Sequence, residues 1–202
     1  MKITDIQTQS KKENRVSVFI DNKFAFGLEK ADCYFMGLKI GMKISKEKYD
    51  YILNNTLYTK AYQKADRFLG FKMRTEKEVY IKLKDLEYPE EIITKVIKTL
   101  KKYNYINDTQ YAILYAKDCQ KLKKWGEARI KLELIKKGIS SQDISVALNE
   151  LEDVNIDMIT SLLEKRIKST PIDFKEKQKH FNFLLRRGFK SEDIKRALEK
   201  YC

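Results

Sequence analysis

The sequence of 202 residues has little cysteine, histidine, proline or glycine. Cys33, Cys119 and Cys202 are scattered and form no C-x-x-C pair, which excludes a disulfide framework and a structural zinc site. His180 is the only histidine, so a metal site with several imidazole ligands is excluded as well. Two prolines and seven glycines leave few helix-breaking positions. This composition favours stacked helices joined by short polar segments.

Long apolar runs and catalytic signatures are also missing. No segment reaches the roughly 18 uncharged apolar residues of a membrane helix, and the chain turns polar directly after Met1. The glycine-rich phosphate loops and the serine and zinc hydrolase motifs do not occur. The acidic pairs Glu90–Glu91 and Glu152–Asp153 lie at predicted helix starts or in joints, where the helix dipole explains them. We therefore expect a cytoplasmic binding protein that is not an enzyme, with no cofactor, no metal and no membrane contact.

Positive charge is what the sequence has in excess. Lys and Arg number 42 against 29 Asp and Glu, a formal net charge of +13. Such a surface favours encounter with polyanions or with acidic protein surfaces. Charge alone does not decide between these two kinds of partner.

The first 30 or so residues favour β structure. Ile3–Gln9 alternates weakly between apolar and polar residues, Arg15–Ile20 is rich in β-branched and aromatic residues, and Phe24–Leu28 has apolar residues at even positions. Asp21–Lys23 joins the last two runs with residues that tolerate a tight turn. We predict a three-strand meander that packs on another element, because a hairpin alone is only marginally stable.

From about residue 46 the pattern is helical. Ser45 is suited to cap the first of these helices, and Thr75 with Glu78 matches a capping box. Pro89 suits the first position of a later helix, and Asn107 with Asp108 suits the cap of another.

The helical part repeats itself with a period near 50 residues. Glu133–Leu148 and Phe183–Leu198 match by residue class at a shift of 50, and Leu83–Ile97 is a weaker third copy at a shift of 51. Each copy is a helix with a basic end, a tight turn, a cap and a second helix. Gly138 and Gly188 fall at the turn, where they predict the left-handed residue that ends a helix. With the helix that precedes each copy, the repeat has three helices.

We predict a mainly α fold of tandem three-helix repeats that form an elongated right-to-left stack, with a small N-terminal β-meander. The predicted division is a meander and connector over residues 1–45 and helical repeats over 46–106, 107–153 and 154–202. A repeat of about 45 residues buries too little surface to be stable alone, so neighbouring repeats are expected to share apolar stripes.

Basic residues recur at the same place in each repeat. We predict as partner or DNA contacts Arg74, Lys77, Lys124, Trp125, Arg129, Lys131, Lys136, Lys137, Arg186 and Arg187. In a stack they form a ridge or groove of like sign that can follow a phosphate backbone or an acidic polymer. Four of these residues lie at predicted helix C-termini: Lys136, Lys137, Arg186 and Arg187. For them, stabilisation of the helix is an alternative to partner contact, since a cation there interacts favourably with the helix dipole by about 0.3–1 kcal/mol. For Trp125, stacking on a base, a protein contact and a place in the core remain open.

Several features in this order resemble the bacterial RecX family of regulatory proteins. They are the tandem three-helix units, the segment Arg74–Val79 before Lys82, the joint Tyr105–Asp108 before Tyr111, and the stretch from Trp125 to Gly138 with its Arg129, Glu133 and Lys137. The resemblance covers about residues 60–202, and the β-rich start resembles the extension of Firmicutes-type members. The first unit departs from the family pattern, with Glu87–Tyr88–Pro89 in place of the Lys-Gly turn.

The resemblance implies a modulator of the RecA recombinase. Family members bind along the RecA–DNA filament and typically inhibit its growth, ATP hydrolysis and strand exchange. It implies the RecA filament as partner, weak contact with single- or double-stranded DNA, and a monomer. The alternative from another class is a free-standing basic DNA-binding protein without a filament partner.

Overall fold

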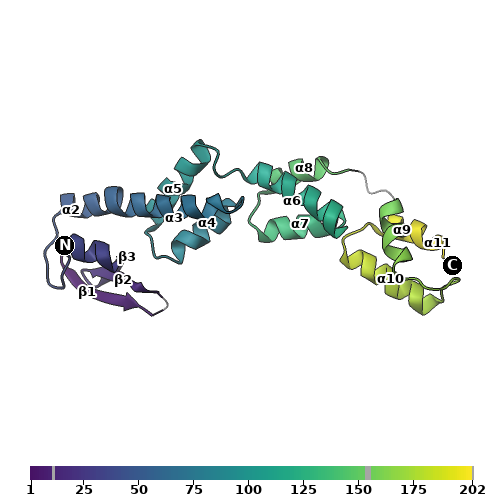
Figure 1. Cartoon of the computed structure of the whole chain (residues 1–202), viewed down its shortest axis with the longest axis horizontal. Coiled ribbons are helices and arrows are strands. Elements are labelled where there is room, and N and C mark those ends of the chain that lie inside the picture. Colours follow the sequence, from purple (N-terminus) through teal and green to yellow (C-terminus); the bar gives the residue numbers. More distant parts are fainter. Residues whose placement is uncertain (11, 153–155, 202) are drawn as a thin grey trace. The chain divides into compact units, whose positions relative to one another are not determined.

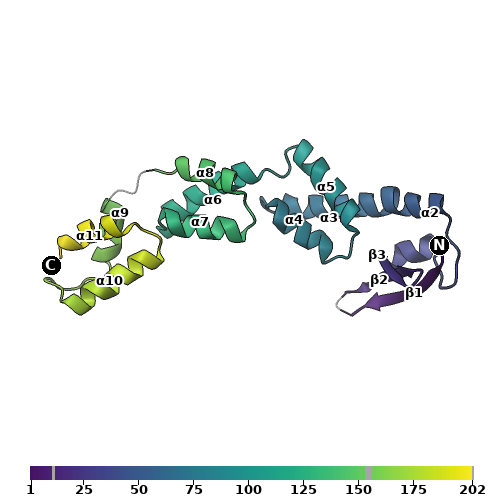
Figure 2. The ribbon, with the colours of Figure 1, turned by 180° about the vertical axis from the view of Figure 1, so that it is seen from behind.

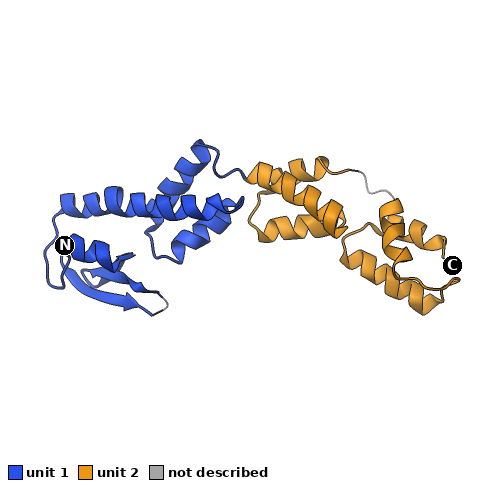
Figure 3. Cartoon of the chain, viewed as in Figure 1, with its two compact units in different colours: residues 1–107 blue, residues 108–202 orange. Residues whose placement is uncertain are grey.

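The computed structural model describes residues 1–10, 12–152 and 156–201. The chain forms two compact units, Met1–Asn107 and Asp108–Cys202 (Figure 3). In the described part of the chain, no helix is long and apolar enough to cross a membrane.

The first unit begins with a three-stranded antiparallel sheet in the order β1-β2-β3 (Figure 1). Its strands are β1 (Ile3–Gln9), β2 (Lys12–Ile20) and β3 (Lys23–Glu29). Asp21 and Asn22 form the turn between β2 and β3 with φ of 47° and 63°. This left-handed pair is what a two-residue hairpin turn requires, and Asp and Asn tolerate it. The predicted meander and its turn are confirmed.

The rest of the first unit is helical. Its segments are α1 (Lys30–Phe35), α2 (Lys46–Tyr51), the π-helical η1 (Ile52–Leu57), α3 (Tyr58–Gly70), α4 (Glu76–Lys84) and α5 (Glu90–Lys102). Ser45 caps α2 by accepting a hydrogen bond from the Lys48 amide, and Thr75 and Glu78 form the capping box of α4. Both caps were predicted. Pro89 instead is the N-cap of α5, because its ψ of 146° is extended and the helix begins one residue later.

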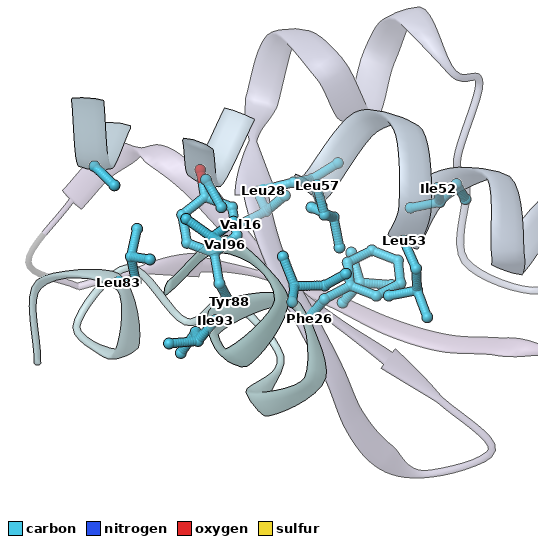
Figure 4. Close-up of a cluster of buried hydrophobic side chains, with 14 of the residues drawn as sticks. Val16, Phe26, Leu28, Ile52, Leu53, Leu57, Leu83, Tyr88, Ile93 and Val96 are labelled. Carbon is cyan, nitrogen blue, oxygen red and sulfur yellow. The ribbon is translucent and has the colours of Figure 1, made fainter. Parts of the chain in front are cut away.

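The sheet and the helices of the first unit share one hydrophobic core. Phe26 and Leu28 of β3 are buried against the same cluster as Leu57 of η1 and Ile93 of α5 (Figure 4). A fully buried side chain of this size contributes about 1.5–3 kcal/mol to folding. The meander therefore packs on helices, as expected for a sheet too small to be stable alone.

The described residues of the second unit form two groups of helices (Figure 2), and each group has its own hydrophobic core. They are α6 (Asp108–Lys123), α7 (Glu127–Lys136) and α8 (Ser141–Asn149), then α9 (Ile156–Glu164), α10 (Phe174–Arg186) and α11 (Ser191–Glu199). Ile130 and Ile144 lie in the first core, and Leu184 and Ile194 lie in the second. The expectation that neighbouring repeats share apolar stripes is wrong for this unit, because polar and backbone contacts join its repeats. The predicted boundary between residues 153 and 154 lies outside the described residues.

The predicted repeat is visible in three matching turns. Glu87, Gly138 and Gly188 have φ of 56°, 84° and 87°. The residue that follows each of these positions is buried, and its amide donates a hydrogen bond to the carbonyl five positions earlier. The donor and acceptor pairs are Tyr88 and Leu83, Ile139 and Leu134, and Phe189 and Leu184. This pattern ends a helix with a left-handed residue and satisfies one of its last carbonyls.

Candidate partner-binding surface

The two repeats of the second unit meet where the turn after α10 lies against the loop between α6 and α7. The amide of Gly126 donates to the Arg187 carbonyl at 2.8 Å, and the amide of Ala128 donates to the Gly188 carbonyl at 3.3 Å. A Cβ atom at Gly126 would lie 2.2 Å from the Gly188 oxygen, and one at Gly188 would lie 2.3 Å from the Arg129 nitrogen. Such distances are far below contact, so both positions require glycine. We call this contact the repeat joint (residues 123–129 with 186–190).

Two arginines cross the repeat joint. Arg187 Nη1 donates to the Lys123 carbonyl at 2.7 Å, and Arg129 Nη1 donates to the Arg186 carbonyl at 3.2 Å. Lys123 and Arg186 are the last residues of α6 and α10, whose terminal carbonyls have no partner within the helix. A cation is favourable at this negative end of a helix.

Aromatic rings hold several cations of the second repeat in place. Tyr111 and Tyr115 lie one turn apart on α6 with their rings stacked at 5.9 Å. Lys137 Nζ lies 5.4 Å and 5.1 Å from the centres of these two rings. Lys123 Nζ lies 5.5 Å from the Tyr115 ring and 4.4 Å from the Trp125 ring. The same indole ring carries Arg129, with Cζ at 5.0 Å from its centre.

The same arrangement continues in the third repeat. The guanidinium groups of Arg166 and Arg187 lie 4.0 Å and 4.9 Å from the centre of the Phe183 ring. Because Arg187 also donates a hydrogen bond to the Lys123 carbonyl, an unbroken series of contacts links these groups. We call the whole set the cation–aromatic row, which consists of Tyr111, Tyr115, Lys123, Trp125, Arg129, Lys137, Arg166, Phe183 and Arg187.

The row is suited to bind negative charge. A cation over a ring gains about 0.5–1 kcal/mol at an exposed site, so the rings hold flexible side chains close to one geometry. This lowers the entropy cost of ordering them on binding. The Trp125 ring carries Lys123 and Arg129, so a base that stacks on it must displace a cation. The arrangement therefore favours contact with phosphate or carboxylate groups over base stacking.

Titratable groups in and beside the row keep fixed protonation states. Glu133 lies 2.9 Å from Lys136 Nζ and 3.8 Å from Arg129 Nε. The hydrogen bond from Lys136 and the neighbouring cations hold the pKa of Glu133 below its ordinary value, so it stays ionised. Burial raises the pKa of Tyr115 and of Cys119, which keeps both neutral. No group of three or more metal-ligating side chains occurs among the residues described.

Comparison with known proteins identifies the family. Four family models match consecutive parts of the chain: the regulatory protein RecX N-terminal domain at residues 1–45, and the first, second and third three-helix domains of RecX at 61–100, 107–148 and 152–198. The chain belongs to the RecX family of regulatory proteins. The resemblance seen in the sequence is confirmed.

Individual RecX proteins match along nearly the whole chain. The regulatory protein RecX of Clostridium acetobutylicum is 34% identical over 98% of this chain and 95% of its own length. That of Clostridioides difficile is 35% identical over 98% of this chain and 94% of its own length. A crystal structure of regulatory protein RecX aligns over 98% of both chains with a TM-score of 0.68 and 27% identity. RecX from Lactobacillus salivarius covers 72% of this chain and 97% of its own, with a TM-score of 0.64 and 28% identity.

In this RecX family member, only some of the predicted contact residues lie together. Trp125, Arg129, Lys137 and Arg187 belong to the cation–aromatic row. Trp125 also packs on the core of the second repeat, which confirms the core role left open for it, while a partner contact stays a prediction. Exposed side chains outside the row are Lys131, Lys136 and Arg186, and Lys124 is half-buried at the end of α6.

Arg74 and Lys77 lie in the first unit. The Arg74 guanidinium lies 4.0 Å from the Phe68 ring of α3, so a cation held by a ring occurs there as well. Lys77 is exposed on α4.

Sequence reasoning missed five members of the row. They are Tyr111, Tyr115, Lys123, Arg166 and Phe183. The four-residue spacing of Tyr111 and Tyr115 was a usable signal for a ring pair on one helix face. The pairing of Arg166 with Phe183 joins distant parts of the sequence and left no local signal.

Proposed function

We propose that this protein binds the RecA–DNA filament and inhibits the recombinase and ATPase activities of RecA, as a non-enzymatic regulator in recombination and DNA repair. The observation that carries the proposal is the relationship to RecX over the whole chain, from the sheet to the third repeat. The proposal includes action as a monomer in the cytoplasm and weak contact with single- or double-stranded DNA.

The cation–aromatic row supports this function. Its cations come from α6 and α7 of the second repeat and from the third repeat, and the repeat joint ties the two repeats together. An anionic polymer can therefore meet several ordered cations on one unit. A protein that contacts successive filament subunits gains a high effective concentration for its second contact. It then shifts the filament toward the subunit arrangement that it binds best.

ATP hydrolysis by RecA on single-stranded DNA tests the proposal. Hydrolysis should fall as this protein is added, and filaments seen by electron microscopy should shorten. An unchanged hydrolysis rate together with unchanged filament length would remove the filament-regulator function.

The net charge of +13 favours one second candidate, a free-standing DNA-binding protein. A salt titration separates the two. Binding through phosphates alone loses affinity with a slope of about −0.9 in log K against log salt for each phosphate neutralised. A filament regulator should instead prefer RecA-coated single strands to bare strands at every salt concentration. Equal affinity for both would favour the second candidate.

A further inference from the structure

A groove separates α7 and α10 on one side of the repeat joint. Its hollow has a volume of about 240 Å³ and is lined by Leu132, Leu185, Lys136, Arg186 and neighbouring residues of the two helices. Small-molecule pockets are about 300–1,000 Å³, so this hollow is too small for most of them. Its size suits one or two side chains of a partner.

The groove exposes two large apolar side chains. Leu132 of α7 is 57% exposed and Leu185 of α10 is 46% exposed. They belong to different repeats, and the repeat joint brings them to one hollow. Exposed apolar side chains of two helices at one hollow are the type of surface into which a protein segment inserts apolar anchor residues.

The border of the groove is cationic. Arg129, Lys136 and Arg186 line it, against one carboxylate, Glu133. Glu133 is already engaged by Lys136 at 2.9 Å and by Arg129 at 3.8 Å. The Arg186 side chain has no hydrogen-bond or ion-pair partner within the described ranges, while the carbonyl of Arg186 accepts a hydrogen bond from Arg129. A partner that carries carboxylates beside its apolar residues is complementary to this border.

We propose that the groove binds an acidic protein segment of a filament subunit, with one or two apolar side chains inserted between Leu132 and Leu185. This inference rests on the proposed function and adds the site and the kind of segment. A nucleic acid is the weaker occupant, because a sugar–phosphate backbone has no aliphatic side chain to fill the hollow.

Truncation of the two leucines tests the proposal. The double variant Leu132→Ala/Leu185→Ala should bind RecA-coated single-stranded DNA at least about tenfold more weakly at every salt concentration, since buried apolar area is lost. Its salt slope should equal that of the parent protein, because no charge is removed. The matched control is Leu114→Ala/Leu122→Ala, in which both leucines are on α6, outside the groove, and 44% and 74% exposed. The control should bind like the parent protein, and circular dichroism should show that both variants are folded.

The charged border has its own test. Arg186→Glu should weaken binding to coated strands and make the binding less dependent on salt, because it replaces a cation at the border with an anion. Lys179→Glu makes the same charge change on the exposed side of α10 and should have a smaller effect.

Three other results would contradict either the groove proposal alone or the proposed function with it. If the leucine double variant binds coated strands like the parent protein, the groove proposal is wrong while the proposed function stands. If the double variant loses as much affinity for bare strands as for coated strands, a nucleic acid occupies the groove and the proposal is wrong. If the parent protein does not distinguish coated from bare strands, the proposed function fails and the groove proposal fails with it.

Discussion

The two units use the same repeat turn as a docking point, with different residues. In the first unit the turn at Glu87 receives the sheet: the Gly27 amide donates to the Glu87 carbonyl at 2.8 Å, and Arg15 donates to the Leu86 carbonyl. In the second unit the turn at Gly188 receives the loop that contains Gly126. In both joints a glycine of the docking element lies against the turn, and an arginine donates to a carbonyl, that of Leu86 within the turn in the first unit and that of Arg186 at the end of α10 in the second.

The difference lies in how the left-handed position is filled. Gly188 adopts φ of 87° without steric cost, and the close approach of Gly126 and Arg129 leaves no space for a side chain at this position. Glu87 adopts φ of 56° and accepts hydrogen bonds from Gln9 and Ser17 through its carboxylate. Backbone strain at Glu87 is thus offset by side-chain contacts to the sheet. The same turn can therefore join a repeat to another repeat or to an unrelated element.

The largest expected effect follows from Gly188→Ala. The new Cβ atom adds strain at a left-handed φ and lies 2.3 Å from the Arg129 nitrogen. Together these should lower the free energy of unfolding of the second unit by about 2–5 kcal/mol. Fluorescence of Trp125, the only tryptophan, measures this in a denaturant titration.

Gly41→Ala is the matched control. Gly41 has the same φ of 87°, with nothing within 4 Å of the added Cβ, so only the strain of about 1–2 kcal/mol should remain. Hydrogen exchange in the first unit measures it. Equal losses in the two variants would contradict the role of close contact in the repeat joint.

Variants of Glu87 test how backbone strain and side-chain hydrogen bonds balance at the turn of the first unit. Glu87→Ala leaves buried Gln9 and half-buried Ser17 without their carboxylate and keeps the strained backbone, so we expect a loss of about 1–3 kcal/mol in the first unit. Glu87→Gly loses the same hydrogen bonds but relieves about 1 kcal/mol of strain. Hydrogen exchange of β2 amides should rank the parent protein above the glycine variant and the glycine variant above the alanine variant. The reverse order of the two variants would show that strain at this turn is negligible.

Arg187 and Arg186 separate a side chain that crosses the repeat joint from an exposed side chain beside it. Arg187→Ala removes the hydrogen bond to Lys123 and the contact with Phe183, so the second unit should lose about 1–2 kcal/mol. Arg186→Ala should change its stability by no more than about 0.5 kcal/mol. Trp125 fluorescence in a denaturant titration compares them, and equal effects would show that the Arg187 side chain does not stabilise the repeat joint.

A pH dependence is the smallest expected effect and concerns the first unit alone. Glu29 lies 2.9 Å from Lys64 and 3.6 Å from Lys60, and these contacts lower its pKa from the ordinary 4.5. A lowered folded-state pKa stabilises the protein above the unfolded pKa, and this contribution is lost as the pH falls through the folded value. Hydrogen exchange of the first unit from about pH 6 to pH 3 should show a smaller decline for Glu29→Gln than for the parent protein. Identical declines would contradict a contribution from Glu29.

Local sequence patterns predicted the turns and caps of the helices and strands. Contacts between residues far apart in the sequence determine how the repeats join and which side chains lie together. The Asp21–Asn22 turn, the Thr75 capping box and the glycine turns depend on neighbours in sequence, so they could be predicted. The hydrogen bond from Arg187 to the Lys123 carbonyl spans 64 residues and has no local signature. The sequence predicted Lys124 and not Lys123 as a contact, but α6 ends at Lys123, whose amine lies over two rings, and Lys124 has a left-handed φ of 52°. The direction of a side chain at a helix end is set by that backbone and not by residue type.

The central claim is that the cation–aromatic row binds the RecA–DNA filament. Its most direct test is the affinity of Lys123→Glu/Lys137→Glu for RecA-coated single-stranded DNA, measured by fluorescence anisotropy at fixed salt beside Lys179→Glu/Lys195→Glu, which changes two exposed lysines of the same unit outside the row. We expect the row variant to bind at least about tenfold more weakly than this control, with an unchanged circular dichroism spectrum. Equal affinity of the two double variants would contradict the claim.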